Sequence, residues 1–239
     1  MMENLRGKNI LLIGATGGIG SACAKLLTSS GANLFLTGRN IQKLQQVAQE
    51  CKIPEGKTCV ADISAASEVA ALKEKYFKQY DTIDILINAA GIGIIKPIES
   101  LDENDFISTI YNNLLGPFLL VKYFIGNMKE QKKGLIINIP GVLGKMPMAG
   151  AAAYSASKYG LVGMMQSIRE EVKRTEIRIT NLFLGGANTP FWDNIDLRVQ
   201  KDKMIQAEEA ARAIWFLCQQ PANAVLSEMV LQPFNHQAI

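Results

Sequence analysis

The chain of 239 residues predicts a single α/β domain in which a doubly wound parallel sheet carries helices on both faces. Short β-rich runs alternate with amphipathic segments along the whole chain, and a glycine-rich turn follows the first run. The runs are almost continuously apolar, as is typical of parallel strands that are covered on both faces. No linker, repeat or low-complexity tract divides the sequence, so residues 1–239 are expected to form one domain.

About seven strands are expected. They are predicted at residues 8–13, 33–37, 57–61, 83–88, 135–139, 177–183 and 228–232. Strands of a doubly wound sheet carry ligand-binding loops at their carboxyl ends, so we expect the functional site at that edge.

Helices are predicted between these strands. The segment at 21–31 ends at Gly31, which is a typical C-terminal stop. The segment at 67–80 is expected to begin after Ser64 as a capping residue. Longer helices are predicted at about 104–130 and 152–174, and residues 191–204 are expected to form a mobile part of a substrate flap at about 186–206.

Composition excludes several classes of function. No apolar run approaches the length of about 18 residues that a membrane span needs, and the N-terminus lacks the apolar core of a signal peptide, which favours a cytoplasmic protein. The four cysteines show no CxxC spacing and the single histidine, His236, has no partners, so we expect reduced thiols and no metal site. A net charge of +3 without a basic run argues against nucleic acid as a partner.

The glycine-rich turn IGATGGIG lies between the first strand and the first helix. Gly14, Gly18 and Gly20 stand where the backbone turns tightly and approaches a pyrophosphate, which lies at a helix N-terminus in dinucleotide-binding folds. A strand before the turn and a helix after it make this motif specific. We therefore expect a Rossmann-type dinucleotide site.

The second strand indicates which dinucleotide is bound. It ends in LTGRN, without the acidic residue that would bond a ribose 2′-hydroxyl, and Arg39 is placed to pair with a 2′-phosphate. This favours NADP(H) over NAD(H), although a solvated arginine on a loop is an alternative. Asp62 after the third strand is a candidate acceptor for the adenine amino group, or an ordinary turn or cap residue.

Four motifs occur in the order GATGGIG, NAAG at 88–91, NNLLG at 112–116 and YSASK at 154–158. Together they resemble the classical short-chain dehydrogenase/reductase family along the whole chain. The resemblance implies an NADPH-dependent oxidoreductase of the carbonyl reductase or alcohol dehydrogenase type.

The resemblance also implies the catalytic residues. Tyr154 corresponds to the acid/base, Lys158 to the residue that holds the nicotinamide ribose, and Asn113 to the asparagine that holds a water in a proton relay. Tyr154 and Lys158 are four residues apart and therefore share a helix face. A free phenol has a pKa near 10, so we expect Lys158 and an oxidised nicotinamide to lower the pKa of Tyr154. A side chain bonded to its own helix backbone is the alternative for Asn113.

A larger set of residues is implied to contact the cofactor. It comprises Gly14, Thr16, Gly17, Gly18, Ile19, Gly20, Arg39, Asp62, Ile63, Asn88, Ala89, Gly91, Tyr154, Lys158 and Thr189. Thr189 corresponds to the threonine that contacts the nicotinamide carboxamide, or it simply caps the next turn.

Three positions depart from the family pattern. Ile13 replaces a threonine and Leu184 replaces a proline, and neither change threatens catalysis outright. Gly141 stands where the family has the serine that hydrogen-bonds the substrate oxygen. Loss of one such donor typically lowers the rate by about 10²- to 10³-fold. Ser157, a bound water or a substrate hydroxyl are alternative donors, whereas Pro140 has no N–H to donate.

Apolar side chains are expected around the substrate. They are Ile92, Ile94, Ile95, Leu143, Met146, Met148, Phe191 and Trp192. Gly141 is expected to border the substrate as well, and Lys145 is the one cation that could hold a carboxylate or phosphate group. These residues predict a largely apolar small-molecule substrate, or alternatively they pack in the core or at a subunit contact. The helices at 104–130 and 152–174 carry apolar residues on more than one face, which favours a homodimer or homotetramer.

Three functions follow from these features. The first is an NADPH-dependent oxidoreductase in which Tyr154 transfers the proton. Because of Gly141, the second is an NADP(H)-binding protein with impaired or no redox catalysis, acting as a sensor or partner subunit. The third is a dehydration or isomerisation that uses Tyr154 without the serine.

Overall fold

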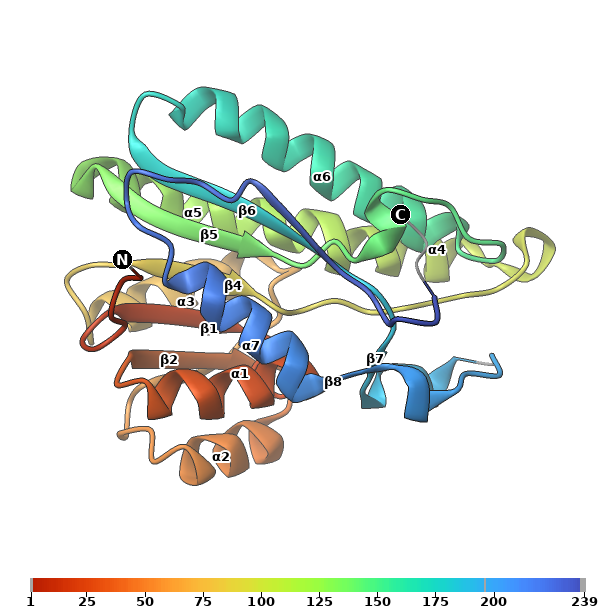
Figure 1. Cartoon of the computed structure of the whole chain (residues 1–239), viewed down its shortest axis with the longest axis horizontal. Coiled ribbons are helices and arrows are strands. Elements are labelled where there is room, and N and C mark those ends of the chain that lie inside the picture. The colour runs from red at the N-terminus through yellow and green to blue at the C-terminus, as the bar shows by residue number, and fades with distance from the viewer. Residues whose placement is uncertain (1, 196, 237–239) are drawn as a thin grey trace.

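The computed structural model describes residues 2–195 and 197–236, and within them the main sheet has seven parallel strands (Figure 1). The strands are β1 (Asn9–Ile13), β2 (Asn33–Gly38), β3 (Thr58–Val60), β4 (Ile85–Asn88), β5 (Lys133–Asn138), β6 (Glu176–Leu184) and β9 (Glu228–Leu231). Their order across the sheet is β3-β2-β1-β4-β5-β6-β9, and every pair is parallel. All seven predicted strands are confirmed to within two residues.

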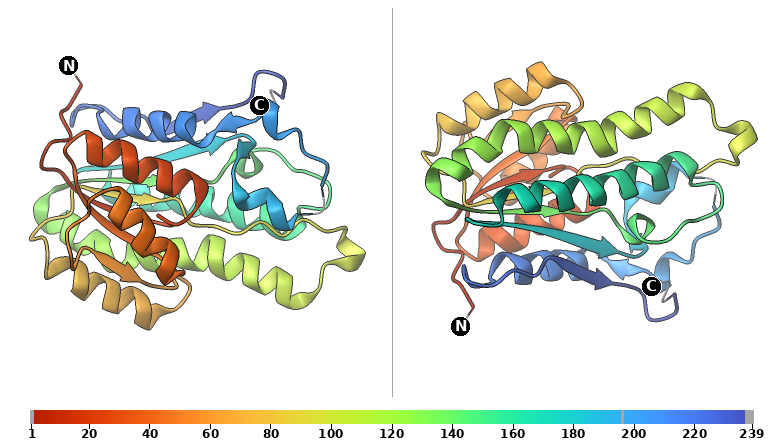
Figure 2. Two further views of the ribbon diagram at one scale, coloured as in Figure 1. Left: turned by 90° about the horizontal axis from the view of Figure 1, so that it is seen from below. Right: turned by 90° about the horizontal axis from the view of Figure 1, so that it is seen from above.

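Two helical layers bury the two faces of the sheet (Figure 2). Helices α1 (Gly18–Ser29), α2 (Ile41–Glu50) and α7 (Ala207–Cys218) pack on one face. Helices α3 (Ala66–Phe77), α5 (Gly116–Gln131) and α6 (Ala152–Val172) pack on the other, and α4 (Glu103–Ile110) lies against α6. The doubly wound α/β class predicted from the apolar runs is therefore confirmed.

The strand order places the site. The chain winds from β1 outward to β3 and then crosses back to β4 on the other side of β1. The carboxyl ends of β1 and β4 flank the point where the winding reverses, which is where ligands bind in open α/β sheets. The glycine-rich turn after β1 and the NAAG segment after β4 both lie there.

Two helical segments differ from the sequence-based expectation. Ser64 does not cap α3, because the N-cap is Ala65 and the Ser64 hydroxyl donates to Asp62 Oδ1 at 2.7 Å instead. The segment predicted as one helix at 104–130 is α4 and α5 joined by a π-helical turn, Tyr111–Leu115. Such turns insert an extra residue and frequently occur at functional sites, and this one turns Asn113 into the protein interior.

The segment expected as a flap leaves the sheet after β6. Strand β7 (Ala187–Asn188) pairs in parallel with β8 (Ile205–Gln206), and this short pair ties the two ends of the excursion together. Between them the chain forms 3₁₀ turns at Pro190–Asn194 and Lys201–Lys203. Whether this segment moves stays a prediction.

Within the two described stretches no helix is long and apolar enough to cross a membrane.

Candidate active site

The turn after β1 is shaped for a close ligand. Gly14 has φ +76°, and a Cβ atom there would lie only 2.7 Å from the backbone nitrogen of Ala90. The first turn of α1 has a glycine N-cap and no acidic side chain. Its free N–H groups therefore face the turn as an anion site, as the pyrophosphate of a dinucleotide requires.

Arg39 and Asp62 stand beside this turn. Arg39 is exposed, and its Nη1 donates to Asn112 Oδ1 at 3.1 Å, so it is held across the end of the sheet rather than freely solvated. Asp62 Oδ1 accepts from both the amide and the hydroxyl of Ser64, which is the turn role considered from the sequence. Partial burial of Asp62 opposes its ionisation, but the Ser64 hydrogen bonds and Arg39 together lower its pKa.

Tyr154 and Lys158 project from the first half of α6. The Lys158 Nζ donates to the carbonyl of Ile139, just after β5, at 3.1 Å and lies 5.4 Å from the centre of the Tyr154 ring. Lys158 is 4% exposed, and burial lowers its pKa to about 8. Burial also raises the pKa of Tyr154. Burial is the cause of both shifts in the chain without a cofactor, and the lowering of the Tyr154 pKa that is expected with an oxidised nicotinamide bound stays a prediction.

Asn113 reaches from the π-helical turn to the loop after β4. Its Oδ1 accepts from the amide of Ile92 and its Nδ2 donates to the carbonyl of Ile92, both at 2.9 Å. The same Nδ2 donates to Ser157 Oγ at 3.1 Å, and the Ser157 hydroxyl donates to the carbonyl of Tyr154 at 2.7 Å. Asn113 thus bonds a neighbouring loop, not its own helix, and Ser157 is already engaged, so it does not replace the missing serine.

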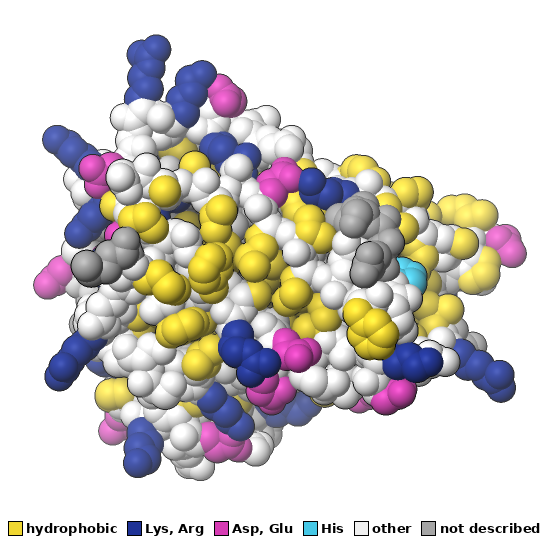
Figure 3. Space-filling model, in the orientation of Figure 1, with side chains coloured by type: hydrophobic (Ala, Val, Ile, Leu, Met, Phe, Trp, Pro, Cys, Tyr) yellow, Lys and Arg dark blue, Asp and Glu magenta, His cyan; other side chains and the backbone are white. Residues whose placement is uncertain are grey.

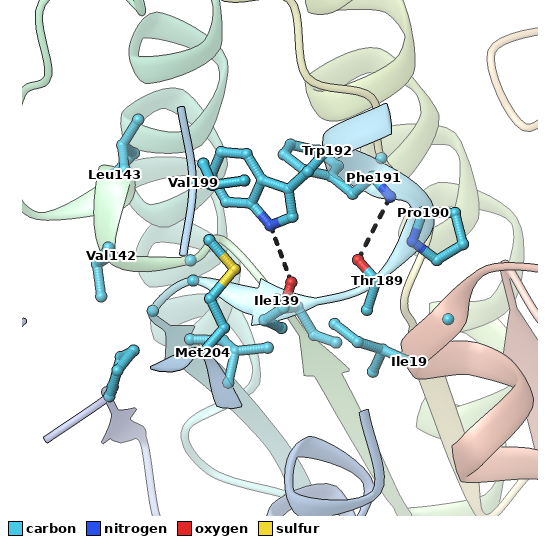
Figure 4. Close-up of a pocket in the computed structure, with 18 of the residues that line it drawn as sticks. Ile19, Ile139, Val142, Leu143, Thr189, Pro190, Phe191, Trp192, Val199 and Met204 are labelled. Carbon is cyan, nitrogen blue, oxygen red and sulfur yellow. Dashed lines mark hydrogen bonds between the residues drawn. The ribbon is translucent and has the colours of Figure 1, made fainter. Parts of the chain in front are cut away.

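A pocket of about 760 Å³ opens at the carboxyl ends of the strands and brings the glycine turn and Tyr154 together (Figure 4). Of the residues expected to contact the cofactor, it is lined by Thr16, Gly17, Gly18, Ile19, Ala89, Gly91, Tyr154 and Thr189. Of those expected to border the substrate, it is lined by Gly141, Ile95, Leu143, Met148, Phe191 and Trp192.

Other expected residues lie outside this lining. Gly14 and Gly20 form the floor of the turn, and Asn88 at the end of β4 bonds the amide of Ala90 through its Oδ1. Lys158 and Asn113 lie behind the wall at Gly91, where a Cβ atom would be 3.4 Å from Lys158 Nζ. The remaining expected residues that do not line the pocket are Arg39, Asp62, Ile63, Ile92, Ile94 and Met146.

Phe191 and Trp192 cover Tyr154 from the flap. The Phe191 ring lies 5.9 Å from the Tyr154 ring, centre to centre, and Trp192 Nε1 donates to the carbonyl of Ala187 at 2.9 Å (Figure 4). Thr189 Oγ1 accepts from the amide of Phe191, so the capping role considered from the sequence is present. These contacts fix an apolar wall above the phenol.

Gly141 has a backbone that other residues rarely adopt. Its φ of +72° and ψ of 172° lie in a region that is essentially restricted to glycine. The position lines the pocket, and a Cβ atom there would meet only the carbonyl oxygen of Leu184, at 3.3 Å. The backbone of the turn after β5 therefore favours glycine at position 141, so the difference from serine is one of backbone conformation as well as of a lost hydroxyl.

The sequence predicted the flap as a segment but not each of the side chains that line the pocket. Those that it did not name include Lys43 from α2, Leu197, Arg198, Val199, Gln200, Lys203 and Met204 from the flap, and Pro233, Asn235 and His236 after β9. Their participation depends on the path of irregular segments, for which periodicity gives no signal. The position of Lys43 in the first turn after the second strand was the one available hint.

Lys145 does not serve as the expected cation of the pocket. Its Nζ pairs with Glu228 at 2.5 Å and lies 4.4 Å from the centre of the Phe183 ring. The expectation that Lys145 is the cation of the pocket is wrong because the Glu228 carboxylate on β9 holds the ammonium away from the pocket.

Comparison with known proteins identifies the family of the chain. The family model of the short chain dehydrogenases matches residues 8–200, and the chain belongs to that family. A sepiapterin reductase of Chlorobaculum tepidum is 32% identical over 95% of this chain and 96% of its own. An uncharacterised oxidoreductase of Staphylococcus epidermidis is 28% identical over 97% of this chain and 100% of its own. A solved structure of a metagenomic short-chain oxidoreductase in complex with NADP is 30% identical, covers 97% of this chain and 99% of that chain, and has a TM-score of 0.84.

Proposed function

We propose that the protein is an NADPH-dependent carbonyl reductase, or the reverse alcohol dehydrogenase, in which Tyr154 transfers the proton. The observation that carries the proposal is that one pocket joins the N-terminus of α1, which fits a pyrophosphate, to the phenol of Tyr154. Membership of the family and the NADP complex of a relative that is 30% identical support the cofactor.

The glycine turn and two cations fit NADP(H). The N-terminus of α1 is placed for the pyrophosphate, and Lys43, in the first turn of α2, lines the same pocket as Gly17 and Gly18. Arg39 is exposed beside the same turn and is placed to pair with a 2′-phosphate. When bound, NADPH supplies a hydride from C4 of its nicotinamide.

The chain supplies the proton and the field around it. A phenol is protonated at neutral pH, and burial raises the pKa of Tyr154 further, so the chain without cofactor presents the protonated form to a carbonyl oxygen. Lys158, held by the carbonyl of Ile139, places its ammonium behind the phenol and within reach of the wall at Gly91. Phe191 contacts the Tyr154 ring and Trp192 lines the same pocket, so we expect these apolar side chains to lower the polarity around the reacting carbonyl.

The glycine at position 141 limits this chemistry. Tyr154 then bonds the substrate oxygen without a serine beside it, and we expect a rate about 10²- to 10³-fold below that of a site with both donors. A water or a substrate hydroxyl fits the space next to Gly141.

A second function is favoured by the same residue. The backbone at Gly141 has a conformation that disfavours a serine at this position. Such a position is expected in a chain that binds NADP(H) as a sensor or partner subunit and does not need the serine for turnover. Tight NADPH binding that changes the affinity for a partner protein, with no turnover on carbonyls, would support this function.

We also propose that the protein forms a homo-oligomer. Hydrophobic side chains gather over the middle of the face on which α7 and β9 lie (Figure 3). Exposed members on those elements and the loop before β9 include Phe216, Val225, Leu226 and Val230. Because β9 is an edge strand of the sheet, pairing with a second copy would cover both its apolar side chains and its open edge.

The direct test of the main proposal is NADPH oxidation in the presence of aldehydes, ketones and diketones. We expect slow turnover by the native protein and none above background by Tyr154→Phe, with unchanged NADPH affinity. A substrate that is converted without any change in the cofactor's redox state would instead support dehydration or isomerisation. Equal turnover by both proteins would contradict the role of Tyr154.

A further inference from the structure

The charged side chains that line the pocket all have one sign. Among the described residues of the lining they are Lys43, Arg198 and Lys203, without an aspartate or glutamate, and His236 is the only other titratable group besides Tyr154. The rest of the lining is mostly apolar or glycine. A pocket with this charge distribution favours a ligand that carries negative charge.

The cations lie at two separate places. Lys43 lies in the first turn of α2, the helix that follows β2, and lines the same pocket as Gly17 and Gly18. Arg198 and Lys203 belong to the flap, where each adjoins an apolar lining residue, Val199 and Met204 respectively. Figure 4 shows Val199 with Leu143 on one side of Trp192, and Ile19 with Pro190 on the other, cofactor side. Arg198 directly precedes Val199 in the chain and lines the same pocket.

Neighbouring carboxylates do not neutralise these two flap cations. Asp193 pairs with Lys201 at 2.6 Å, and Asp202 lies with Lys203 on a second hollow without forming an ion pair with it among the described residues. Within the described residues, neither Arg198 nor Lys203 forms an ion pair. Their charges are therefore free to act on a ligand.

We propose that the substrate is an acid, with a carboxylate or phosphate group held by Arg198 and Lys203 and an apolar body that lies against Leu143, Met148 and Trp192. This inference rests on the proposed function and specifies its substrate. It adds an acidic group to the largely apolar substrate expected from the sequence and assigns the role expected of Lys145 to two cations of the flap. The acidic group lies at the end of the substrate away from the carbonyl that faces Tyr154.

The size of the effect follows from the exposure of the cations. Both side chains are exposed, so water and salt screen their attraction to an anion. A guanidinium also offers a two-pronged hydrogen bond to a carboxylate or phosphate, which strengthens the contact. We expect a preference of about tenfold for an acid over its neutral ester, and a smaller preference at high salt.

Matched probes measure this preference. The substrates are 4-carboxybenzaldehyde, its methyl ester and 4-formylphenyl phosphate, and kcat/KM is measured for the native protein and for the double variant Arg198→Gln/Lys203→Gln. The expected result is a preference for at least one of the two acids over the ester, which disappears in the double variant and shrinks at high salt. Which acid is preferred decides between a carboxylate and a phosphate.

Lys201→Gln is the matched control, because Lys201 is a cation of the same flap that pairs with Asp193 and does not line the pocket. It should keep the preference for the acid. A native protein that converts acids and ester equally well would overturn the proposal, as would a preference that survives the double variant or is lost equally in Lys201→Gln.

A binding measurement separates this inference from the proposed function. Titration calorimetry compares 4-(hydroxymethyl)benzoate and 4-(hydroxymethyl)phenyl phosphate with the neutral methyl 4-(hydroxymethyl)benzoate on NADP-saturated protein. Selective binding of an acid that depends on Arg198 and Lys203, without turnover of any aldehyde, would leave the anion site standing and remove the reductase. Turnover with equal binding of acids and ester would do the opposite.

Discussion

Burial controls the protonation of the two side chains on which the proposed proton transfer depends. Tyr154 keeps its proton because the phenolate would be desolvated, and the same effect brings the pKa of Lys158 down to about 8. The spacing of the two residues on a helix was evident from the sequence. The direction of the Tyr154 shift was not, because it depends on how deeply α6 and the flap enclose the ring.

The lowered pKa of Lys158 predicts a pH dependence. Below pH 8 the ammonium is charged and supports proton donation by Tyr154, and above it the amine becomes neutral. The reductive kcat/KM should therefore fall as the pH rises through about 8. In Lys158→Arg, whose guanidinium stays charged, a lower but pH-independent rate is expected in this range. The same fall in both proteins would assign the titration to another group.

Arg39 predicts the choice of cofactor. Arg39→Ala should weaken NADPH binding by roughly 10- to 100-fold, because a charge-assisted contact to the 2′-phosphate is lost, and should leave NADH binding nearly unchanged. Lys43→Gln is the comparison, since Lys43 lines the same pocket as Gly17 and Gly18 and a similar loss is therefore expected for both cofactors. Fluorescence titration with each cofactor measures the four affinities. Equal losses of NADPH and NADH in Arg39→Ala would refute the phosphate role.

At the scale of elements, regular segments were predictable and irregular ones were not. The seven strands of the sheet follow from apolar runs that have to be buried on both faces. The π-helical turn at Tyr111–Leu115 has no periodic signal, and the N-terminus of α3 formed at Ala65 because Asp62 engages the Ser64 hydroxyl. The flap was predicted as a segment, but the side chains of it that line the pocket were not, because their positions depend on tertiary packing.

The turn after β5 gives a prediction of stability. Gly141→Ser and Gly141→Ala should each lower the free energy of unfolding by about 1–3 kcal/mol, because a side chain is strained at a φ of +72°. Urea denaturation measures both values. The alanine variant carries the same strain without a hydroxyl, so higher activity in the serine variant than in the alanine variant reports the hydroxyl alone. Unchanged stability in both would mean that the backbone at Gly141 is not confined to glycine.

At the scale of the whole molecule, the edge of the sheet predicts assembly. The native protein should have the mass of a dimer or tetramer in light scattering, and Val230→Glu should shift it toward the monomer because a charge on β9 opposes a second apolar surface. Ile41→Glu is the control, since Ile41 is exposed to a similar degree at the start of α2 and belongs to neither α7 nor β9. A native monomer, or an identical shift in both variants, would contradict assembly through β9.

The pocket itself is a property of the whole chain. Its walls come from the turn after β1, the segments after β4 and β5, helix α6, the flap and the residues after β9. The sequence predicted the cofactor half because a motif marks it. It predicted the substrate half only in its apolar character, because the charged residues there lie on segments without a motif.

The most direct test of the central claim is the transfer of deuterium from NADPH labelled at C4 to a carbonyl substrate, measured by mass spectrometry of the product. We expect one deuterium on the new carbinol carbon with the native protein and none above background with Tyr154→Phe at saturating NADPH. Product formed without deuterium, or labelled equally well by Tyr154→Phe, would contradict hydride transfer assisted by Tyr154.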